Sequence, residues 1–407
     1  VRLLAAGLPP AGWPDDLWLV DQGWRWRPPR AAPGDPAADL PHGLSRLPDL
    51  RKPGCCYVCK IRFQRRHFWY DQLCQECGDA NYARREQRAD LGGLTALVTG
   101  GRINIGYATV LRLLRNGARV IATSRFPRDA ARRFAAEPDS ARWLDRLALR
   151  GLDLRFLPEV ERFAAELRGA YPKLDILINN AAQTVRQPAA YYAPLLAGEL
   201  GPDSVPPALL GVIGDASPGA PDDHPAALAT IPPPASYLAA LARELAAGGG
   251  GAPPNSWTLT LDELPLSELV EAQLVNALAP AVLIQQLKPL LLKGRPAFIV
   301  NVAAAEGQFA RAKRPYHPHT NMAKAALNML THTAAAGYAA EGVFINSVDP
   351  GWVSLQAPAA GDGEPPASLP IDLADAAARI CAPVFDGLLG GAPAAGKLFK
   401  DYAEAPW

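Results

Sequence analysis

The sequence predicts an α/β fold in which helices cover both faces of a doubly wound parallel sheet. Short apolar runs of strand character alternate with longer helix-like runs from residue 94 onward. A glycine-rich turn follows the first of these runs and opens a helix-like stretch. The hydrophobic content of 49% is enough for a large core in a chain of 407 residues.

Five strands and five helices are expected in this part of the chain. The strand-like runs are residues 95–99, 119–123, 175–179, 297–302 and 344–348. The helix-like runs are residues 107–116, 158–170, 266–292, 320–340 and 372–387. Repeated alternation of this kind is typical of parallel strands joined by helices.

The chain divides into three regions. Residues 1–52 are rich in Trp and Pro, and we expect their indole rings to anchor them on another part of the protein, the alternative being a flexible arm. Residues 53–90 form a small cysteine module, and residues 91–407 form the α/β domain. Residues 186–257, dense in Pro, Gly and Ala, interrupt the alternation, so we expect an insertion that is a lid, an interface or disordered.

Composition excludes some classes of function. Because 41 Lys and Arg balance 40 Asp and Glu, the overall charge gives no argument for binding nucleic acid or a membrane surface. No run of about 18 apolar residues occurs, so no membrane-spanning segment is expected. Six cysteines, four of them with metal-binding spacing, suit a reducing compartment, and we expect a cytoplasmic protein.

The glycine-rich turn indicates a dinucleotide site. Gly100, Gly101 and Gly106 allow backbone N–H groups to approach a pyrophosphate at the N-terminus of the following helix. Asn104 stands where a further glycine is usual, and asparagine tolerates the left-handed backbone better than most residues.

The end of the second strand favours NADP(H) over NAD. An acidic residue there would bind the ribose hydroxyls and repel a 2′-phosphate, but the sequence has Ser124 and Arg125. Arg125 and Arg102 are therefore expected to pair with the 2′-phosphate. The alternative is that both arginines are merely solvated.

Taken together, these motifs resemble the short-chain dehydrogenase/reductase family, whose fold is a Rossmann-type doubly wound sheet. The resemblance covers residues 94–407 apart from the insertion, through motifs at residues 99–106, 153–154, 179–182, 276, 324 and 349–353. With the two arginines, it implies a cofactor site formed by Gly100, Arg102, Asn104, Ile105, Gly106, Arg125, Asp153, Leu154, Asn179, Asn180, Ala181, Lys324, Pro350 and Gly351.

The resemblance also implies a catalytic Tyr-x-x-x-Lys pair, a serine and an asparagine. Lys324 and Asn276 match, but Thr320 occupies the tyrosine position and Ala304 the serine position. A threonine hydroxyl is far less acidic than a phenol, whose pKa is about 10. The remaining candidates for the proton donor are Tyr316 and His319, which precede the helix and are otherwise surface residues, and Lys324 itself if burial lowers its pKa.

The cysteine module predicts a structural zinc site. Cys56 and Cys59 form one Cys-x-x-Cys pair and Cys74 and Cys77 form another, the set that binds zinc tetrahedrally. Cys55 and His67 are possible substitutes. Over residues 51–88, nine Lys and Arg exceed four Asp and Glu by five, with aromatics interleaved. This pattern fits nucleic-acid binding, but we prefer a module docked on the α/β domain with its aromatics turned inward.

Three functions remain. The first is a divergent NADP(H)-dependent oxidoreductase that acts on an unidentified small-molecule substrate through a proton donor other than tyrosine. The second is a non-redox enzyme or pseudoenzyme that keeps the nucleotide site for structure or sensing. The third is an interaction protein whose zinc module binds a partner or nucleic acid. The resemblance further implies a homo-oligomer that associates through long helices, and the run 266–292 is apolar enough for this.

Overall fold

The computed structural model describes residues 17–20, 23–26, 49–186, 189–200, 209, 211–213, 255–353 and 369–407. Its main sheet has the strand order β12-β11-β10-β9-β8-β5-β6-β7. All neighbouring strands in it are parallel except β11 and β12. The predicted doubly wound parallel sheet is therefore confirmed.

The five predicted strands are present with ends that agree within one residue. The main sheet consists of β5 (Thr95–Val98), β6 (Arg119–Ser124), β7 (Leu147–Gly151), β8 (Ile176–Asn179), β9 (Ala297–Val302), β10 (Val343–Asp349), β11 (Leu398–Lys400) and β12 (Ala403–Ala405). The sequence analysis missed β7, β11 and β12. Strand β5 pairs with β6 on one side and with β8 on the other. The chain first adds β6 and β7 on one side of β5 and then crosses to the other side at β8, so the strand order reverses at β5. Ligands bind at such a switch point, beyond the carboxyl ends of the strands.

Helices cover both faces of the sheet. One face packs against α2 (Asn104–Arg115), α3 (Pro127–Ala135) and α10 (Leu373–Leu388). The other packs against α4 (Leu157–Ala170), α8 (Ala279–Leu291) and α9 (Pro318–Ala340), and α7 (Leu266–Gln273) contacts α9. A π-helical turn, Leu274–Leu278, joins α7 to α8. Short 3-10 turns occur at Ser140–Arg142, Leu144–Arg146, Ser256–Thr258 and Ala305–Gly307.

The joined helix Leu266–Leu291 is long and apolar enough to cross a membrane by length and composition alone, which is weak evidence. Of its most apolar window, 56% is buried inside the protein. Leu283, Leu287 and Leu291 of this helix belong to the core against the sheet. A core helix has the same composition, because one of its sides is covered by the rest of the fold.

Part of the insertion expected at residues 186–257 is built into the fold. Helix α5 (Ala189–Leu200) lies against α3, whose first backbone N–H groups donate to Glu199 from Arg128 (3.1 Å) and Asp129 (2.7 Å). Tyr192 of α5 is buried beside Phe126. The sequence analysis expected the insertion to be a lid, an interface or disordered. For the rest of the insertion this expectation falls on residues that the structure does not describe.

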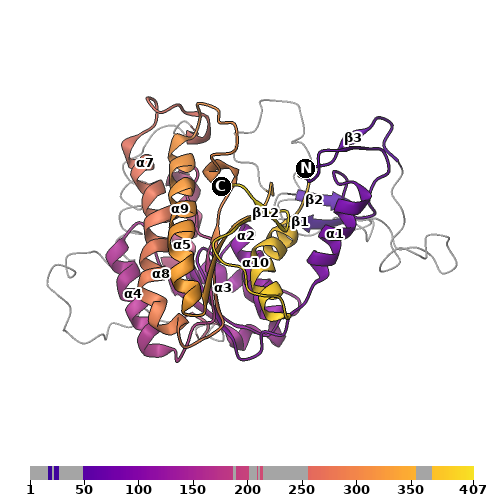
Figure 1. Ribbon diagram of the computed structural model, residues 1–407. Helices are drawn as coiled ribbons and strands as arrows, with labels where there is room; N and C mark the ends of the chain where they lie inside the picture. The colour runs from indigo at the N-terminus through magenta and orange to yellow at the C-terminus, as the bar shows by residue number, and fades with distance from the viewer. Residues whose placement is uncertain are drawn as a thin grey trace.

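Two smaller units precede the α/β domain. Strands β1 (Leu17–Val20) and β2 (Gly23–Trp26) form an antiparallel hairpin, whose side chains lie outside the description, so the anchoring role expected of the indoles stays a prediction. The cysteine module consists of β3 (Gly54–Cys55), β4 (Arg62–Phe63) and α1 (Gln75–Glu86). Figure 1 shows α1 beside α10, on the side of the domain away from α4 and α8.

Candidate nucleotide and metal sites

The glycine-rich turn adopts the backbone that the sequence predicted. Gly100 has φ 72° and Asn104 has φ 54°, so asparagine does take the left-handed conformation at this position. A Cβ on Gly106 would lie 2.1 Å from the carbonyl oxygen of Gly100. Only glycine therefore fits where the start of α2 passes over the turn.

Side chains from β5 and from the end of β8 hold the turn in place. The Asn180 amide donates to the carbonyl oxygens of Thr99 (3.0 Å) and Gly100 (3.2 Å). The Thr99 hydroxyl accepts from the backbone N–H groups of Asn180 and Ala181, both at 3.0 Å. The turn is thus fixed before any ligand arrives, which reduces the entropy lost on binding.

A cavity of about 410 Å³ opens at the carboxyl ends of these strands. Its size lies within the range of small-molecule and cofactor sites. It is lined by Gly100, Arg102, Ile103, Asn104, Ile105, Gly106, Thr123, Ser124, Arg125, Phe126, Leu152, Asp153, Leu154, Asn180, Ala181, Ala182, Gln183, Thr184, Val185, Tyr191, Tyr192 and Val275. Ten of the predicted cofactor residues are in this set.

Four predicted cofactor residues are not part of the cavity wall. Asn179 points into the sheet, where its amide donates to Asn301 at 2.8 Å. Pro350 and Gly351 lie under Arg379, which donates to the Pro350 carbonyl at 3.1 Å. The side chain of Lys324 is turned toward β9.

The charge of the cavity is predominantly positive where β6 ends. Arg102 donates to Asp129 at 2.8 Å, and the Arg125 guanidinium lies 5.4 Å from the centre of the Tyr192 ring. Among the described lining residues Asp153 is the one carboxylate, and Arg155 binds it at 2.8 Å. No carboxylate in this wall therefore stands where it would repel a 2′-phosphate.

Asn276 and its neighbours separate the cavity from the expected catalytic positions. Asn276 lies in the π-helical turn and is fully buried. Its amide accepts from the backbone N–H of Gln183 (2.7 Å) and donates to the carbonyl of the same residue (2.9 Å). Gln183 lines the cavity, so Asn276 fixes the wall from behind.

Lys324 is buried on α9, and its ammonium donates to the carbonyl oxygen of Val302 at 2.6 Å. Burial lowers the pKa of Lys324 to about 8, although the carboxylates of Glu306 and Asp349 act in the opposite direction. An amine with this pKa is charged at neutral pH but gives up its proton more readily than an exposed lysine.

Thr320 and His319 are both 1% exposed at the start of α9. The Nε2–H of His319 donates to the carbonyl of Thr184, a residue of the cavity wall, at 2.9 Å. Within the described part of the chain, neither His319 Nδ1 nor Thr320 Oγ1 has a hydrogen-bond partner. Unpaired buried polar atoms are uncommon and mark sites of function or of missing solvent.

Tyr316 and Ala304 complete the set of expected catalytic positions. Tyr316 is 42% exposed, so its loop leaves the phenol at the surface instead of placing it beside Lys324. Ala304 precedes the short turn Ala305–Gly307 and carries no hydroxyl toward the site. Gly307 packs on the backbone of Lys324, since a Cβ on it would lie 2.6 Å from the carbonyl carbon.

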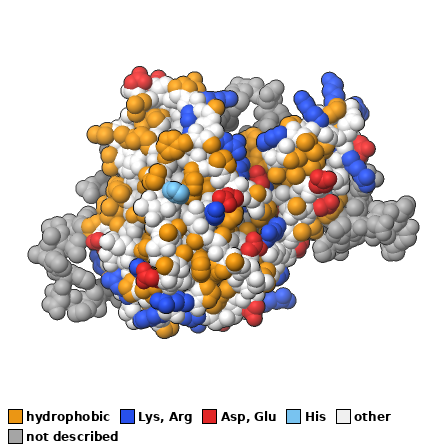
Figure 2. All heavy atoms as spheres, viewed as in Figure 1, with side chains coloured by type: hydrophobic (Ala, Val, Ile, Leu, Met, Phe, Trp, Pro, Cys, Tyr) orange, Lys and Arg blue, Asp and Glu red, His pale blue; other side chains and the backbone are white. Residues whose placement is uncertain are grey.

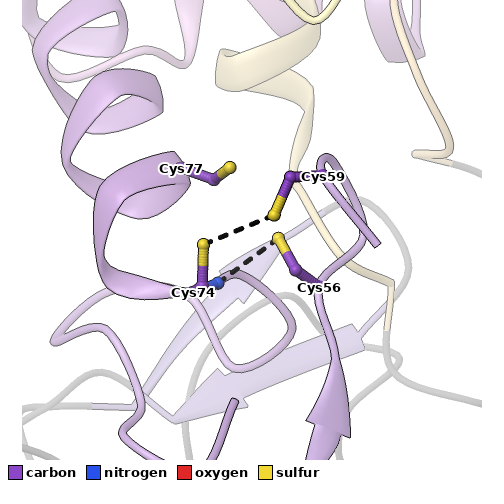
Figure 3. A group of neighbouring side chains, drawn as sticks. All are labelled: Cys56, Cys59, Cys74 and Cys77. Atoms are coloured by element: carbon purple, nitrogen blue, oxygen red, sulfur yellow. Dashed lines mark hydrogen bonds between the residues drawn. The ribbon is translucent and has the colours of Figure 1, made fainter. Parts of the chain in front are cut away.

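The four cysteines with metal spacing converge (Figure 3). Cys56 and Cys59 come from the loop between β3 and β4, whereas Cys74 and Cys77 come from the start of α1. Their sulfur atoms all lie within 4.8 Å of one another, and Cys59 Sγ is 3.7 Å from Cys74 Sγ. Tetrahedral Zn–S bonds of about 2.3 Å require sulfur atoms about 3.8 Å apart. The donor set and its spacing therefore fit zinc.

The two alternative ligands are directed elsewhere. Cys55 is exposed and its thiol lies 3.2 Å from the carbonyl of Lys60. His67 is fully buried, and its Nδ1 accepts from the backbone N–H groups of Trp69 (3.0 Å) and Tyr70 (3.3 Å). Burial lowers the pKa of His67 to about 4, so its ring is neutral and structural.

The module is docked with its aromatics inward, as the sequence analysis preferred. Phe68, Tyr70 and Tyr82 pack with Val353 and Ile371 of the α/β domain. Most of the basic side chains remain at the surface, although Arg85 is buried, and Figure 2 shows Lys and Arg side chains over the part of the surface that the module forms. These three rings are therefore covered and cannot stack on the bases of a single-stranded nucleic acid.

Comparison with known proteins places the chain in a family. Residues 94–194 match the model described as short chain dehydrogenase, and residues 250–371 match the model described as enoyl-(acyl carrier protein) reductase. A relative in Acanthamoeba polyphaga mimivirus, called uncharacterized protein R665, is 30% identical over 348 residues, covering 81% of this chain and 71% of the relative. The chain belongs to the short-chain dehydrogenase/reductase family, of which it is a divergent member.

Named relatives align over a shorter stretch. Dehydrogenase/reductase SDR family member 13 of Bos taurus is 40% identical over 94 residues, covering 23% of this chain and 24% of the relative. Retinol dehydrogenase 14 of Mus musculus is 37% identical over 100 residues, covering 22% and 29%. The chain thus aligns with about a quarter of the length of these enzymes.

Solved structures show similar chains. The NADPH-bound carbonyl reductase from chicken fatty liver matches with TM-score 0.49 and 18% identity, covering 79% of this chain and 100% of that one. The RhlG/NADP active-site complex of Pseudomonas aeruginosa matches with TM-score 0.42 and 22% identity, covering 65% and 75%. The family assignment rests on the two family models.

Sequence reasoning missed one part of the cavity wall. Tyr191 and Tyr192 line it from α5, inside the segment that looked like an unstructured insertion. The only local signal is a pair of aromatics in a stretch otherwise dominated by Pro, Gly and Ala. Their position depends on α3 and on Arg125, contacts that the sequence does not display.

Proposed function

We propose that the chain binds NADP(H) in the 410 Å³ cavity and acts as an oxidoreductase on a small-molecule substrate. The observation that supports this most is the convergence of the glycine turn, the start of α2 and two arginines at the switch point of the sheet. The N-terminus of a helix offers free N–H groups and a positive dipole to a pyrophosphate. Relatives named as dehydrogenases and reductases support the same class of reaction.

A preference for NADP(H) over NAD(H) follows from the charges at the end of β6. Arg125 lines the cavity directly after Ser124, and Arg102 lies across from it on the glycine turn. Arginine binds phosphate through several N–H groups in a fixed plane. Arg102 pairs with Asp129, and Arg125 stands at the end of β6, where the residue that contacts the ribose 2′ position is expected, so we assign most of the proposed selectivity to Arg125.

The bound cofactor would supply or accept the hydride, and the chain must exchange a proton with the substrate oxygen. We propose that Lys324 exchanges this proton with the substrate oxygen and also holds the cofactor ribose. Its pKa of about 8 lets it donate at neutral pH and be reprotonated, whereas the Thr320 hydroxyl cannot be a comparable acid. His319, which contacts the cavity wall through Thr184, is the second candidate for the proton relay.

The experiment that tests this proposal follows NADPH oxidation with a panel of aldehydes and ketones. The proposal expects turnover that falls at least a hundredfold in Lys324→Met, with NADPH binding reduced less than turnover. The variant His319→Gln separates the two donors, because a loss of turnover as large as that of Lys324→Met, with NADPH binding retained, would assign the proton to histidine. Binding without any turnover across the panel removes the redox function.

A second function is favoured by one observation. Thr320, Lys324 and Asn276 are absent from the described cavity wall, and Gln183, Thr184 and Val185 lie on it instead. A nucleotide could therefore bind without meeting the catalytic positions. In that case the protein is a non-redox enzyme or a nucleotide sensor, and it binds NADPH with no turnover of any carbonyl.

The cysteine cluster would hold a structural zinc ion through Cys56, Cys59, Cys74 and Cys77. Four thiolates leave no open coordination position, so we propose that the metal stabilises the module and takes no part in the reaction. Persistent thiolates suit a reducing compartment, which supports a cytoplasmic location.

A homo-oligomer is proposed from the outer face of α7 and α9. Leu266 (72% exposed), Val270 (46%), Met322 (50%) and Met329 (58%) lie on these helices, which contact each other. Figure 2 shows hydrophobic side chains over this part of the surface. Exposed apolar side chains gathered in one area are typical of association sites.

A further inference from the structure

We infer that the cysteine module is a positioning element of the nucleotide site, so that cofactor affinity depends on zinc. This inference rests on the proposed function, because it requires NADP(H) in the cavity and zinc on the four cysteines. It goes further by assigning to the module a role in holding the start of α2 at the cavity, and to Tyr57 a role in holding the segment after β10, where the sequence places the cofactor residues Pro350 and Gly351.

Helix α2 is the first link between the module and the cavity. Arg112 of α2, 9% exposed, donates to the carbonyls of Arg84 (3.0 Å), Arg85 (2.8 Å) and Gln87 (2.9 Å) at the end of α1. Carbonyls at the end of a helix lack the full set of partners within the helix, and of these three the Arg84 carbonyl also accepts from the backbone N–H of Gln87 at 3.3 Å. At its other end, α2 places Ile105 both in the cavity wall and against the hydrophobic core of the module.

The segment after β10 is the second link. The Tyr57 hydroxyl accepts a hydrogen bond from the backbone N–H of Trp352 at 2.8 Å. Arg379 of α10, 1% exposed, donates to the carbonyl of Pro350 and also to Asn81 of α1 at 2.7 Å. A Cβ on Gly351 would lie 2.5 Å from the Arg379 guanidinium, so the segment is enclosed on this side.

Buried ion pairs fasten the module to α10. Arg85 binds Asp372 at 2.7 Å and Asp375 at 3.0 Å, and the Tyr70 hydroxyl donates to Asp375 at 2.6 Å. Asp375 is fully buried. If the module unfolds, Asp375 loses the Arg85 guanidinium and the Tyr70 hydroxyl, and Arg379 loses Asn81 but keeps its ion pair with Asp401. Removal of one partner of a buried ion pair is costly.

Zinc affects these contacts because the module needs the metal in order to fold. A small unit with a structural zinc site folds only with its metal, because its own hydrophobic core is too small. Loss of zinc therefore releases α1 from Arg112 and Tyr57 from Trp352. The start of α2, which forms the proposed pyrophosphate site, then loses the packing of Ile105.

The test measures NADPH affinity by nicotinamide fluorescence on the full chain, with zinc content determined in the same samples. We expect one zinc per chain, an increase in the NADPH dissociation constant of at least tenfold after chelation, and recovery when zinc is added back. Tyr57→Phe removes only the hydroxyl that accepts from Trp352, and should weaken NADPH binding about threefold to tenfold with zinc content unchanged.

The matched control is Tyr338→Phe. Its hydroxyl also bonds a backbone group, the carbonyl of Ile284 at 3.4 Å, but on the opposite face of the sheet. NADPH affinity should be unchanged in this variant. If Tyr57→Phe and chelated protein that is still folded bind NADPH as tightly as the zinc-loaded protein, the positioning role is wrong and the nucleotide site stands.

Two further outcomes of the same experiment decide between the proposed function and the inference about the module. Should zinc-loaded protein fail to bind NADPH, the proposed function itself is wrong. If chelation unfolds the whole chain by circular dichroism, the comparison of Tyr57→Phe with Tyr338→Phe decides alone, and equal affinities in the two variants overturn the inference.

Discussion

Arg125 provides the sharpest test of cofactor choice. Replacing it with glutamine keeps a polar side chain of similar reach but removes the charge that faces the cavity at the end of β6. NADPH and NADH differ only in the 2′-phosphate, so a residue that binds this group must affect one cofactor and spare the other.

The magnitude follows from the setting of the side chain. A hydrogen bond to a charged group contributes about 1.5–3 kcal/mol, and each 1.4 kcal/mol corresponds to a tenfold change in affinity. Arg125 is partly exposed, and Arg102 remains nearby as a second cation although Asp129 holds it. The lower end of the range therefore applies, and Arg125→Gln should weaken NADPH binding about tenfold.

Isothermal titration of both cofactors into both proteins measures this effect. The dissociation constant for NADH should change less than about twofold, because no phosphate contact is lost. Arg162→Gln, which removes an arginine from the outer side of α4, is the control and should change neither affinity. Equal losses for NADPH and NADH in Arg125→Gln would refute phosphate recognition by this residue.

Three further predictions concern stability, the turn and assembly. The pKa of Lys324 in the folded protein lies near 8, below its ordinary value, so the unfolded chain binds this proton more tightly. The contribution of Lys324 to the free energy of unfolding should therefore rise from pH 8 to 10.5, by at most about 3 kcal/mol. Urea unfolding at both pH values should show this rise as a difference between the native protein and Lys324→Met, because the buried tyrosines and Cys381, whose raised pKa values lower stability over the same range, act equally in both proteins. Gly106→Ala should abolish NADPH binding in the same titration, whereas Gly169→Ala, with open space around its Cβ, should not. Val270→Lys should reduce the mass seen by light scattering, and an unchanged mass would remove α7 from the interface.

The sequence was sufficient for the parts of the fold that local physics determines. Asn104 could be placed in the left-handed region because few residues tolerate it, and its φ of 54° agrees. Strands β11 and β12 could not be predicted, because each has three residues and is stabilised by pairing with a distant strand or with its own hairpin.

The candidate site was predictable in composition but not in arrangement. The sequence identifies Thr320 and Lys324 by position, yet the direction of the Lys324 ammonium depends on the carbonyl of Val302, 22 residues away in the chain. The contact between Tyr70 and Asp375 joins residues 305 positions apart, and no local pattern encodes it. The contacts between the module and the α/β domain became visible only in three dimensions.

A crystal structure of the zinc-loaded protein with NADPH tests the central claim most directly. The account predicts the pyrophosphate over Gly100 and the start of α2, the 2′-phosphate beside Arg125, and the nicotinamide ring within reach of the Lys324 ammonium, turned away from Val302. NADPH bound outside this cavity, or a protein that excludes NADPH at millimolar concentration, would contradict the account.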